Sequence, residues 1–195
     1  MAKSTQIVTT AAPGRADQVR NRMRLVTAAR AAIAQQGTSV PLTEVARRAE
    51  LSPATLYRHF PNRAALLVGV FEGELNQCHA ILDRAIESAD PGAAIFRAIR
   101  DVAALEAAQP GVMMTLVDQP GISSDLTIFR QRSFDQLRQL VDQARASGTV
   151  RDDLTLEDVY LVLVAVKAIA QSDPNRALTR ALRAVELFEQ GCAVH

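Results

Sequence analysis

The sequence has little of the chemistry that enzymes and metal sites use. Its 195 residues include no tryptophan, two cysteines and three histidines, namely His59, His79 and His195. Cys78 and Cys192 lie far apart and match no zinc-ligand spacing, so we expect two reduced thiols and neither a metal site nor another cofactor. A glycine-rich phosphate loop and a serine nucleophile elbow are also missing from the sequence. These absences argue against an enzyme.

Long hydrophobic runs are missing too. The longest strongly apolar run, at 159–170, is too short to span a bilayer and carries Lys167. The N-terminal 18 residues contain no apolar stretch of signal-peptide length. Apolar residues make up 48% of the chain, which is enough for a substantial core. We therefore expect a cytoplasmic protein with no membrane partner.

Strand signals are almost absent, and helical periodicity dominates. The sequence has no long alternating stretch and no Asn-Gly or Asp-Gly hairpin turn, whereas proline and glycine separate segments of helical spacing. This pattern predicts an all-α fold. In the first segment, Val19, Met23, Val26, Ala29 and Ile33 are spaced as one buried stripe. Nine helices are expected, at about 18–36, 42–49, 52–60, 63–87, 90–107, 112–117, 125–146, 156–171 and 174–190.

The net charge of +1 hides an uneven distribution. Residues 1–70 hold ten basic and three acidic side chains, a balance of +7. The remaining 125 residues hold 12 basic and 18 acidic side chains, a balance of −6. A basic first third beside an acidic remainder indicates a segment that meets a polyanion, although charge alone does not separate DNA, RNA and anionic membrane.

The stretch SPATLYRHF at 52–60 predicts a short helix with one buried face. Ser52 suits the N-cap and Pro53 the first helical position. Leu56 and Phe60 are four residues apart, so they share a face that can pack on the first helix. The side chains then left on the outer face and its flanks are Ala54, Thr55, Tyr57, Arg58 and His59.

A second short helix precedes this stretch, and a turn of about three residues, 50–52, joins the two. Two short helices with such a turn make a helix-turn-helix, whose second helix enters the major groove of DNA. The small side chains of helix 52–60 suit base edges and thymine methyls, while its phenol, imidazole and guanidinium suit phosphates. The expected DNA-contacting residues are Thr43, Ser52, Pro53, Ala54, Thr55, Tyr57, Arg58, His59 and Arg63. The alternative is a polar, solvated helix in an ordinary bundle.

The segment at 37–67, GTSVPLTEVARRAELSPATLYRHFPNRAALL, resembles the DNA-binding segment of the TetR family of bacterial transcriptional regulators. The resemblance implies a nine-helix TetR-like fold, with an N-terminal three-helix DNA-binding domain and a larger helical domain for ligand binding and dimerisation. Glu50 stands where the family usually has glycine. If the backbone at that position is left-handed, a non-glycine residue there costs roughly 1 kcal/mol of conformational free energy. Arg63 replaces the usual lysine. The residues that carry the resemblance are Val45, Ala46, Ala49, Leu51, Ser52, Thr55, Leu56, Tyr57, His59, Phe60, Asn62, Arg63 and Leu66.

The resemblance also implies a domain plan and a homodimer. We expect a disordered arm at 1–17, whose contact with DNA stays open, a DNA-binding domain at 18–61, and a ligand-binding and dimerisation domain at 62–195. Members of the family dimerise through their last two long helices, here about 156–171 and 174–190. The alternative is that these two helices only complete the core of one subunit.

By the same resemblance, the middle of the chain holds a pocket for an unknown small-molecule effector, expected to be hydrophobic or amphipathic. At any single position, plain core packing is the alternative. Tyr160, Thr115 and Gln119 are further polar candidates. The candidate ligand-binding residues are Asn76, His79, Phe96, Met113, Met114, Leu116, Val117, Phe129 and Phe134.

Together these features predict a ligand-responsive repressor that binds a palindromic operator in double-stranded DNA as a dimer. A ligand that binds better to a splayed dimer would release the DNA, with the helix at 63–87 as the lever. The rival is an all-α small-molecule carrier or adaptor without DNA binding. Strongly salt-dependent duplex binding favours the regulator over that carrier.

Overall fold

The computed structural model describes residues 14–37, 39–109 and 124–194, and within these ranges it is helical. Its eight α-helices and one 3-10 turn confirm the all-α prediction, and the predicted short helix at 112–117 lies outside the described residues. The one β-type pairing in the described ranges is an isolated bridge between Val150 and Ala193. The elements are α1 (Arg15–Gln36), α2 (Leu42–Arg48), α3 (Pro53–His59), α4 (Arg63–Ile86), α5 (Pro91–Ala108), α7 (Ser124–Ala146), α8 (Leu156–Ser172), η1 (Pro174–Arg176) and α9 (Ala177–Cys192).

Side-chain caps set several of the helix starts. The Asn62 side chain accepts a hydrogen bond from the Ala65 amide (2.8 Å) at the start of α4, and the Asp90 carboxylate accepts one from Ala93 (3.1 Å) at the start of α5. Thr155 and Asp158 form the predicted capping box of α8. These local signals explain why the predicted and observed boundaries agree closely.

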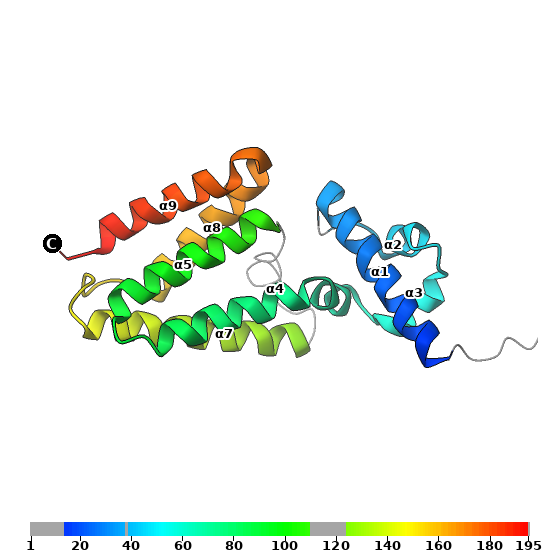
Figure 1. Ribbon diagram of the computed structural model, residues 1–195, viewed down its shortest axis with the longest axis horizontal. Helices are drawn as coiled ribbons and strands as arrows, with labels where there is room; N and C mark the ends of the chain where they lie inside the picture. The colour runs from blue at the N-terminus through cyan, green and yellow to red at the C-terminus, as the bar shows by residue number, and fades with distance from the viewer. Residues whose placement is uncertain (1–13, 38, 110–123, 195) are drawn as a thin grey trace, which may run out of the picture.

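The described helices form two units that α4 joins (Figure 1). Helices α1, α2 and α3 cluster at the N-terminal end of α4, whereas α5 and α7 pack along the rest of it and α8 and α9 pack on α5. The larger unit is held together by packing of α5 against α4, α7, α8 and α9. Because α4 contributes to both cores, a movement of this helix changes how the two units are placed.

Helix α1 differs from its prediction at its N-terminal end. It begins at Arg15, so the expected arm at 1–17 includes the first turn of a helix. Val19 and Met23 were expected in the buried stripe but are 57% and 65% exposed. The buried face instead runs through Leu25, because α1 packs on α2 and α4 with its C-terminal half. The residues of that face are Leu25, Ala29, Ala32 and Ile33.

None of the described helices combines the length and apolar composition that crossing a membrane requires.

Candidate nucleic-acid interface and effector cavity

The turn between α2 and α3 has the left-handed residue that a helix-turn-helix needs. Glu50 has φ 51° and is the one non-glycine residue with positive φ in the described ranges. The Glu50 amide donates to the Arg47 carbonyl and the Leu51 amide to the Ala46 carbonyl, both at 3.0 Å. The condition under which Glu50 costs conformational energy is therefore met. Its carboxylate, 86% exposed, pairs with Arg24 of α1 at 3.0 Å.

Helix α3 presents the outward face that its spacing predicted. Leu56 and Phe60 are buried, at 0% and 1% exposure, whereas Tyr57 is 49% exposed. Ala54 and Arg58 are exposed as well. The Ser52 hydroxyl accepts a hydrogen bond from the Thr55 amide at 3.1 Å, which caps the helix as expected. The polar side of α3 is thus exposed and accessible to a large binding partner such as duplex DNA.

Contacts around Phe60 fix α3 against α4 and α1. The Phe60 ring lies so close to Gly69 of α4 that a Cβ there would stand 2.7 Å from Phe60 Cε1. The Arg22 guanidinium lies over the Phe60 ring, with its central carbon 4.7 Å from the ring centroid. Arg22 also pairs with Glu72 of α4 at 3.9 Å. Phe60, at the C-terminal end of α3, is therefore in contact with both α4 and α1.

The basic side chains around α3 differ in how many hydrogen bonds they make within the protein. Arg47 and Arg48 both donate to Glu44 at 2.8 Å, and these bonds lower the pKa of Glu44 to about 2. Arg63 donates to the Ser39 carbonyl at 3.3 Å, so part of its hydrogen-bonding capacity is used within the protein. Thr43, at the start of α2, is exposed.

His59 lies at the edge of this surface and is half-buried. Burial, together with the positive charges of Arg58 and Arg22, lowers its pKa. Its Nε2 atom is buried and has no hydrogen-bond partner within the protein. The lowered pKa favours the neutral form of this imidazole.

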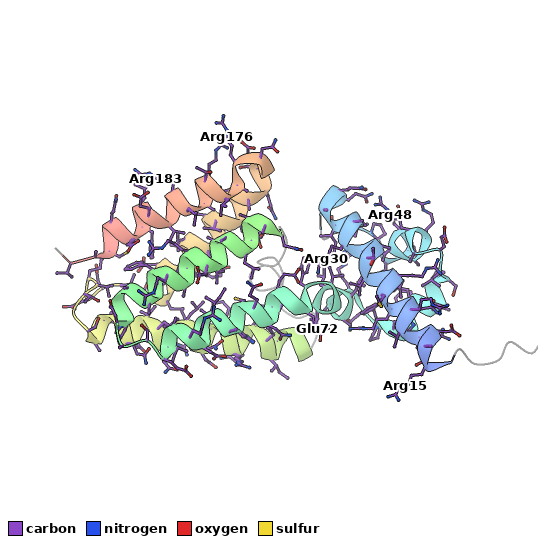
Figure 2. All side chains as sticks on the ribbon, viewed as in Figure 1. Arg15, Arg30, Arg48, Glu72, Arg176 and Arg183 are labelled. Atoms are coloured by element: carbon purple, nitrogen blue, oxygen red, sulfur yellow. The ribbon has the colours of Figure 1, made fainter. Side chains whose placement is uncertain are left out.

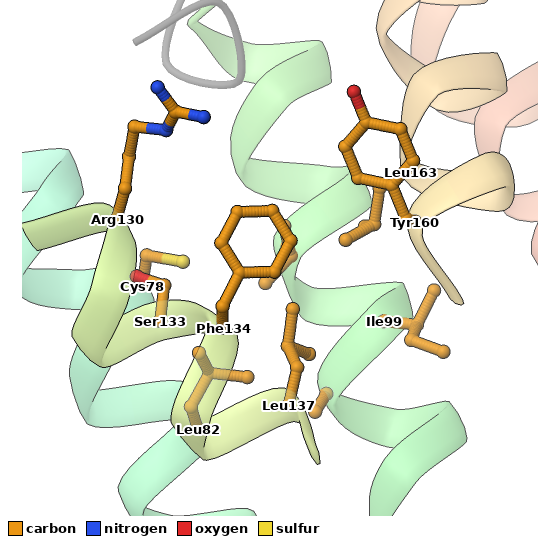
Figure 3. A pocket seen from close by; sticks show the side chains of 11 residues that line it. Cys78, Leu82, Ile99, Arg130, Ser133, Phe134, Leu137, Tyr160 and Leu163 are labelled. Carbon is orange, nitrogen blue, oxygen red and sulfur yellow. The ribbon is translucent and has the colours of Figure 1, made fainter. Parts of the chain in front are cut away.

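The larger unit contains an apolar cavity between α4, α5, α7 and α8 (Figure 3). About 40 Å3 inside it is open to water-sized molecules, which is room for a few waters. Of the predicted ligand-binding residues, Phe134 lines it, and so does Tyr160. The lining residues that sequence reasoning missed are Cys78, Leu82, Ala98, Ile99, Val102, Arg130, Ser133, Leu137 and Leu163.

The other described candidates lie elsewhere. Asn76 is exposed on α4. Phe96 packs edge-to-face on Phe188 of α9, with ring centroids 6.2 Å apart, and so belongs to the core. His79 is buried and stacks on Phe129 at 3.9 Å between centroids, while its Nε2 hydrogen-bonds the Ser133 hydroxyl at 3.0 Å. The structure therefore does not place these four side chains in the cavity wall.

Four candidates, Met113, Met114, Leu116 and Val117, lie outside the described residues, as do Thr115 and Gln119. The sequence gives only a weak indication that the missed residues line a cavity. Cys78 and Leu82 are four residues apart and so share one helix face. That spacing marks a buried face, but it does not tell which helix lies opposite.

Helices α8 and α9 keep apolar side chains on their outer sides. They pack on each other and on α5 through Val159, Val166, Ala181 and similar residues. Leu161 on α8 remains 55% exposed, and Leu178 and Leu187 on α9 remain 49% and 53% exposed. Helical spacing places Ala165 and Ala168, also exposed, on the same side of α8 as Leu161. Leu187 is nine residues, or two and a half turns, from Leu178, so it lies on the opposite side of α9. We call the other four residues the α8–α9 outer face.

A search of the described ranges for three or more His, Cys, Asp or Glu side chains able to hold a metal ion finds no such group.

Two family profiles match the chain. Residues 25–70 match bacterial regulatory proteins of the tetR family, and residues 90–193 match the SbtR-like C-terminal domain of transcriptional regulators. The HTH-type transcriptional repressor KstR of Mycobacterium tuberculosis is 28% identical over 176 residues, which are 88% of this chain and 77% of KstR. A TetR transcription regulatory protein from Mycobacterium vanbaalenii is 31% identical; the alignment covers 93% of this chain and 100% of that one, with a TM-score of 0.50. A TetR family transcription regulator from Marinobacter aquaeolei shares the fold with a TM-score of 0.63, at 20% identity, over 93% of this chain and 98% of its own.

Proposed function

This chain belongs to the TetR family of bacterial regulatory proteins, which are DNA-binding transcriptional regulators, and we propose that it acts as a repressor that binds a palindromic operator as a homodimer. The observation that carries the proposal is the outer face of α3, which is polar and exposed and whose opposite side contacts α4 through Phe60. The similarity to KstR, a transcriptional repressor, supports repression over activation. Regulation, rather than catalysis, is the activity that we assign.

In this proposal residues 15–61 read DNA. Pro53, Ala54 and Thr55 at the start of α3 meet base edges, where short side chains allow close approach to thymine methyls. The exposed phenol of Tyr57 and guanidinium of Arg58 bind phosphates on either side. Supporting contacts come from Thr43, Ser52, His59 and Arg63.

Residues 62–195 provide effector binding and dimerisation. One α3 reads too few base pairs for a selective site, so two copies must present their recognition helices one turn of DNA apart, about 34 Å. The α8–α9 outer face supports this arrangement, because an exposed apolar surface on two adjacent helices is stabilised when a second copy covers it. The resulting interface is a four-helix bundle of two α8 and two α9 helices.

The effector acts through the cavity. Its free space is small, so a ligand must separate α7 or α8 from α4 and α5 in order to enter. Because α4 carries Gly69 against Phe60, a shift of α4 moves α3 with it. A ligand that binds better to the shifted state than to the DNA-binding state lowers operator affinity by that difference in binding free energy.

Selection of bound duplexes from a random DNA pool tests the proposal. We expect a palindromic consensus whose half-sites are one helical turn apart, with an affinity that falls steeply as salt rises. An unpaired half-site would contradict the homodimer. Absent or salt-insensitive binding would contradict the regulator and favour an all-α small-molecule carrier.

A further inference from the structure

The cavity wall carries two aromatic rings that come from different helices. Phe134 of α7 and Tyr160 of α8 both line the cavity, with ring centroids 6.1 Å apart and ring planes tilted by 31°. Figure 3 shows the two rings beside each other, with Leu82 and Leu137 below them in the view. Because both rings belong to the wall, each presents a face or an edge to the molecule that fills the cavity.

The polar groups beside these rings offer little to a charged ligand. The Ser133 hydroxyl donates to the Phe129 carbonyl at 3.1 Å and is hydrogen-bonded to His79 Nε2 at 3.0 Å. Burial raises the pKa of the Cys78 thiol to about 12, so this group is neutral. The Arg130 side chain already has an interaction within the protein. A charged ligand would therefore displace an existing interaction or lie among hydrocarbon side chains without a counter-charge, and either costs free energy.

The packing of the helices indicates where the cavity widens. Helices α7 and α8 each pack extensively on α5, whereas they contact each other at few positions. Phe134 and Tyr160 stand on the two sides of this boundary. When α7 or α8 moves to admit a ligand, the few contacts between these two helices break most readily. The space therefore opens between the two rings.

An aromatic ring gains more from that space than a saturated ring of the same size. Aromatic pairs with centroids about 4.5–7 Å apart are stabilised beyond the area that they bury, by about two- to tenfold in affinity for each pair. A ligand ring in contact with both Phe134 and Tyr160 makes two such pairs. The polarisable sulfur of Cys78, which also lines the cavity, suits an aromatic neighbour as well.

We propose that the effector is an uncharged aromatic compound whose ring binds between Phe134 of α7 and Tyr160 of α8. The inference rests on the proposed function, because it names the ligand class of the same effector cavity. Since the two rings stand on different helices, the bound ligand fixes the spacing of α7 and α8. Helix α7 also packs on α4, so this spacing acts on the helix that joins the two units.

Four soluble probes with a six-membered ring test the proposal. Benzyl alcohol, cyclohexylmethanol, benzoate and benzylamine are titrated into the full-length protein at neutral pH, and binding is followed by ligand-observed NMR. Cyclohexylmethanol is the more hydrophobic alcohol, so plain filling of an apolar cavity predicts that it binds more tightly. We expect the opposite order, with benzyl alcohol about two- to tenfold tighter. Benzoate and benzylamine should each bind at least about tenfold more weakly than benzyl alcohol, because their charges are not compensated.

Phe134→Leu and Tyr160→Leu identify the rings responsible. Each variant removes one ring and keeps an apolar side chain, so the preference for benzyl alcohol over cyclohexylmethanol should shrink or reverse. Tyr160→Phe keeps the ring without its hydroxyl and should retain the preference. The matched control on α7 is Phe129→Leu, which removes a ring that stacks on His79 outside the cavity wall and should also retain it. If Phe134→Leu does not fold, the two Tyr160 variants still decide the outcome.

Equal or tighter binding of cyclohexylmethanol overturns the aromatic preference. Binding of benzoate or benzylamine as tight as that of benzyl alcohol, or no binding of any probe, overturns the ligand class. A preference that survives both Phe134→Leu and Tyr160→Leu overturns the assignment to these rings.

Operator binding is measured on the same preparations, first without ligand and then with benzyl alcohol well above its dissociation constant. We expect benzyl alcohol to weaken operator binding. Absence of operator binding without ligand would contradict the proposed function. Operator binding that benzyl alcohol leaves unchanged would contradict only this inference.

Discussion

Arg30 of α1, labelled in Figure 2, forms an ion pair with Glu74 of α4 across the junction of the two units, with 2.5 Å between Nη1 and Oε1. The same guanidinium donates to the Val70 carbonyl and to the side chain of Gln109, the C-cap of α5. One side chain of the DNA-binding unit thus holds α4 and the end of α5 together. The cavity-lining residues of α5 lie on the helix that ends at this contact.

Arg30→Met should lower the free energy of unfolding by about 1–2 kcal/mol, a modest loss because Arg30 is partly open to water while Glu74 loses its partner. Urea unfolding followed by circular dichroism measures it. Arg20→Met is the control, since Arg20 is 72% exposed on the same helix and should change stability by less than about 0.5 kcal/mol. Equal effects of the two substitutions would show that the junction contact contributes nothing.

The left-handed residue in the turn predicts a stabilising substitution. Glu50→Gly relieves φ 51°, worth roughly 1 kcal/mol, and gives up an exposed pair with Arg24 that contributes little. We expect a net gain of about 0.5–1 kcal/mol in thermal or urea unfolding. Glu50→Ala is the matched control, because it loses the pair without relieving φ, and it should be neutral or slightly destabilising. No difference between the two variants would mean that the turn is not strained.

The strain at Glu50 was anticipated only as a condition, through the glycine that the family usually has there. In contrast, local sequence alone predicted the outer face of α3, from the spacing of Leu56 and Phe60, and the caps at Asn62 and Thr155. Each of these features depends on residues within a few positions of one another. The helix boundaries and the recognition face could therefore be predicted closely.

The cavity could not be predicted in the same way. Phe96 and Phe134 are the same residue type on helices of similar pattern, yet one packs on Phe188 in the core and the other lines the cavity. They differ in which helix packs against them. That depends on the tertiary structure and leaves no pattern in the neighbouring sequence. Val19 and Met23 show the same limit, since their spacing fits a buried stripe but no helix in the described ranges covers them.

Arg58 should contribute a phosphate contact that is independent of sequence. Arg58→Gln is expected to weaken operator binding uniformly across related duplexes and to reduce the slope of log affinity against log salt by about one. Fluorescence anisotropy at several salt concentrations measures both quantities. Arg145→Gln, an exposed arginine at the end of α7, should leave the slope unchanged. An unchanged slope for Arg58→Gln would remove this residue from the DNA-binding surface.

The α8–α9 outer face should be the dimer interface. Leu161→Glu places a charge in its middle, so we expect monomers in sedimentation velocity, with helical content retained and operator affinity largely lost. Ile128→Glu is the matched control, because Ile128 is an equally apolar residue, 68% exposed, on α7. If Leu161→Glu stays dimeric, the two copies associate through another surface.

Stability should fall as the pH is lowered below neutrality, and His79 should account for part of the fall. Burial, with help from nearby Arg132, lowers the pKa of His79, although a hydrogen bond to the Phe129 backbone and the charge of Asp83 act in the opposite direction. The unfolded chain, with an ordinary histidine pKa near 6.5, therefore binds the proton first as the pH falls. The stability that neutral His79 provides is complete above that value and is lost progressively below it. Carboxylates such as Glu44, whose pKa is lowered to about 2, do not titrate in this window.

His79→Phe keeps an aromatic ring against Phe129, and Ser133 still donates to the Phe129 carbonyl at 3.1 Å. The difference in melting temperature between pH ~7.5 and ~5.5 should accordingly be smaller in this variant than in the parent protein. A residual difference is expected from His59, whose pKa is lowered as well, and His59→Gln should reduce it further. A pH dependence that is the same with and without His79 would show that its imidazole takes up a proton in the folded protein as readily as in the unfolded chain.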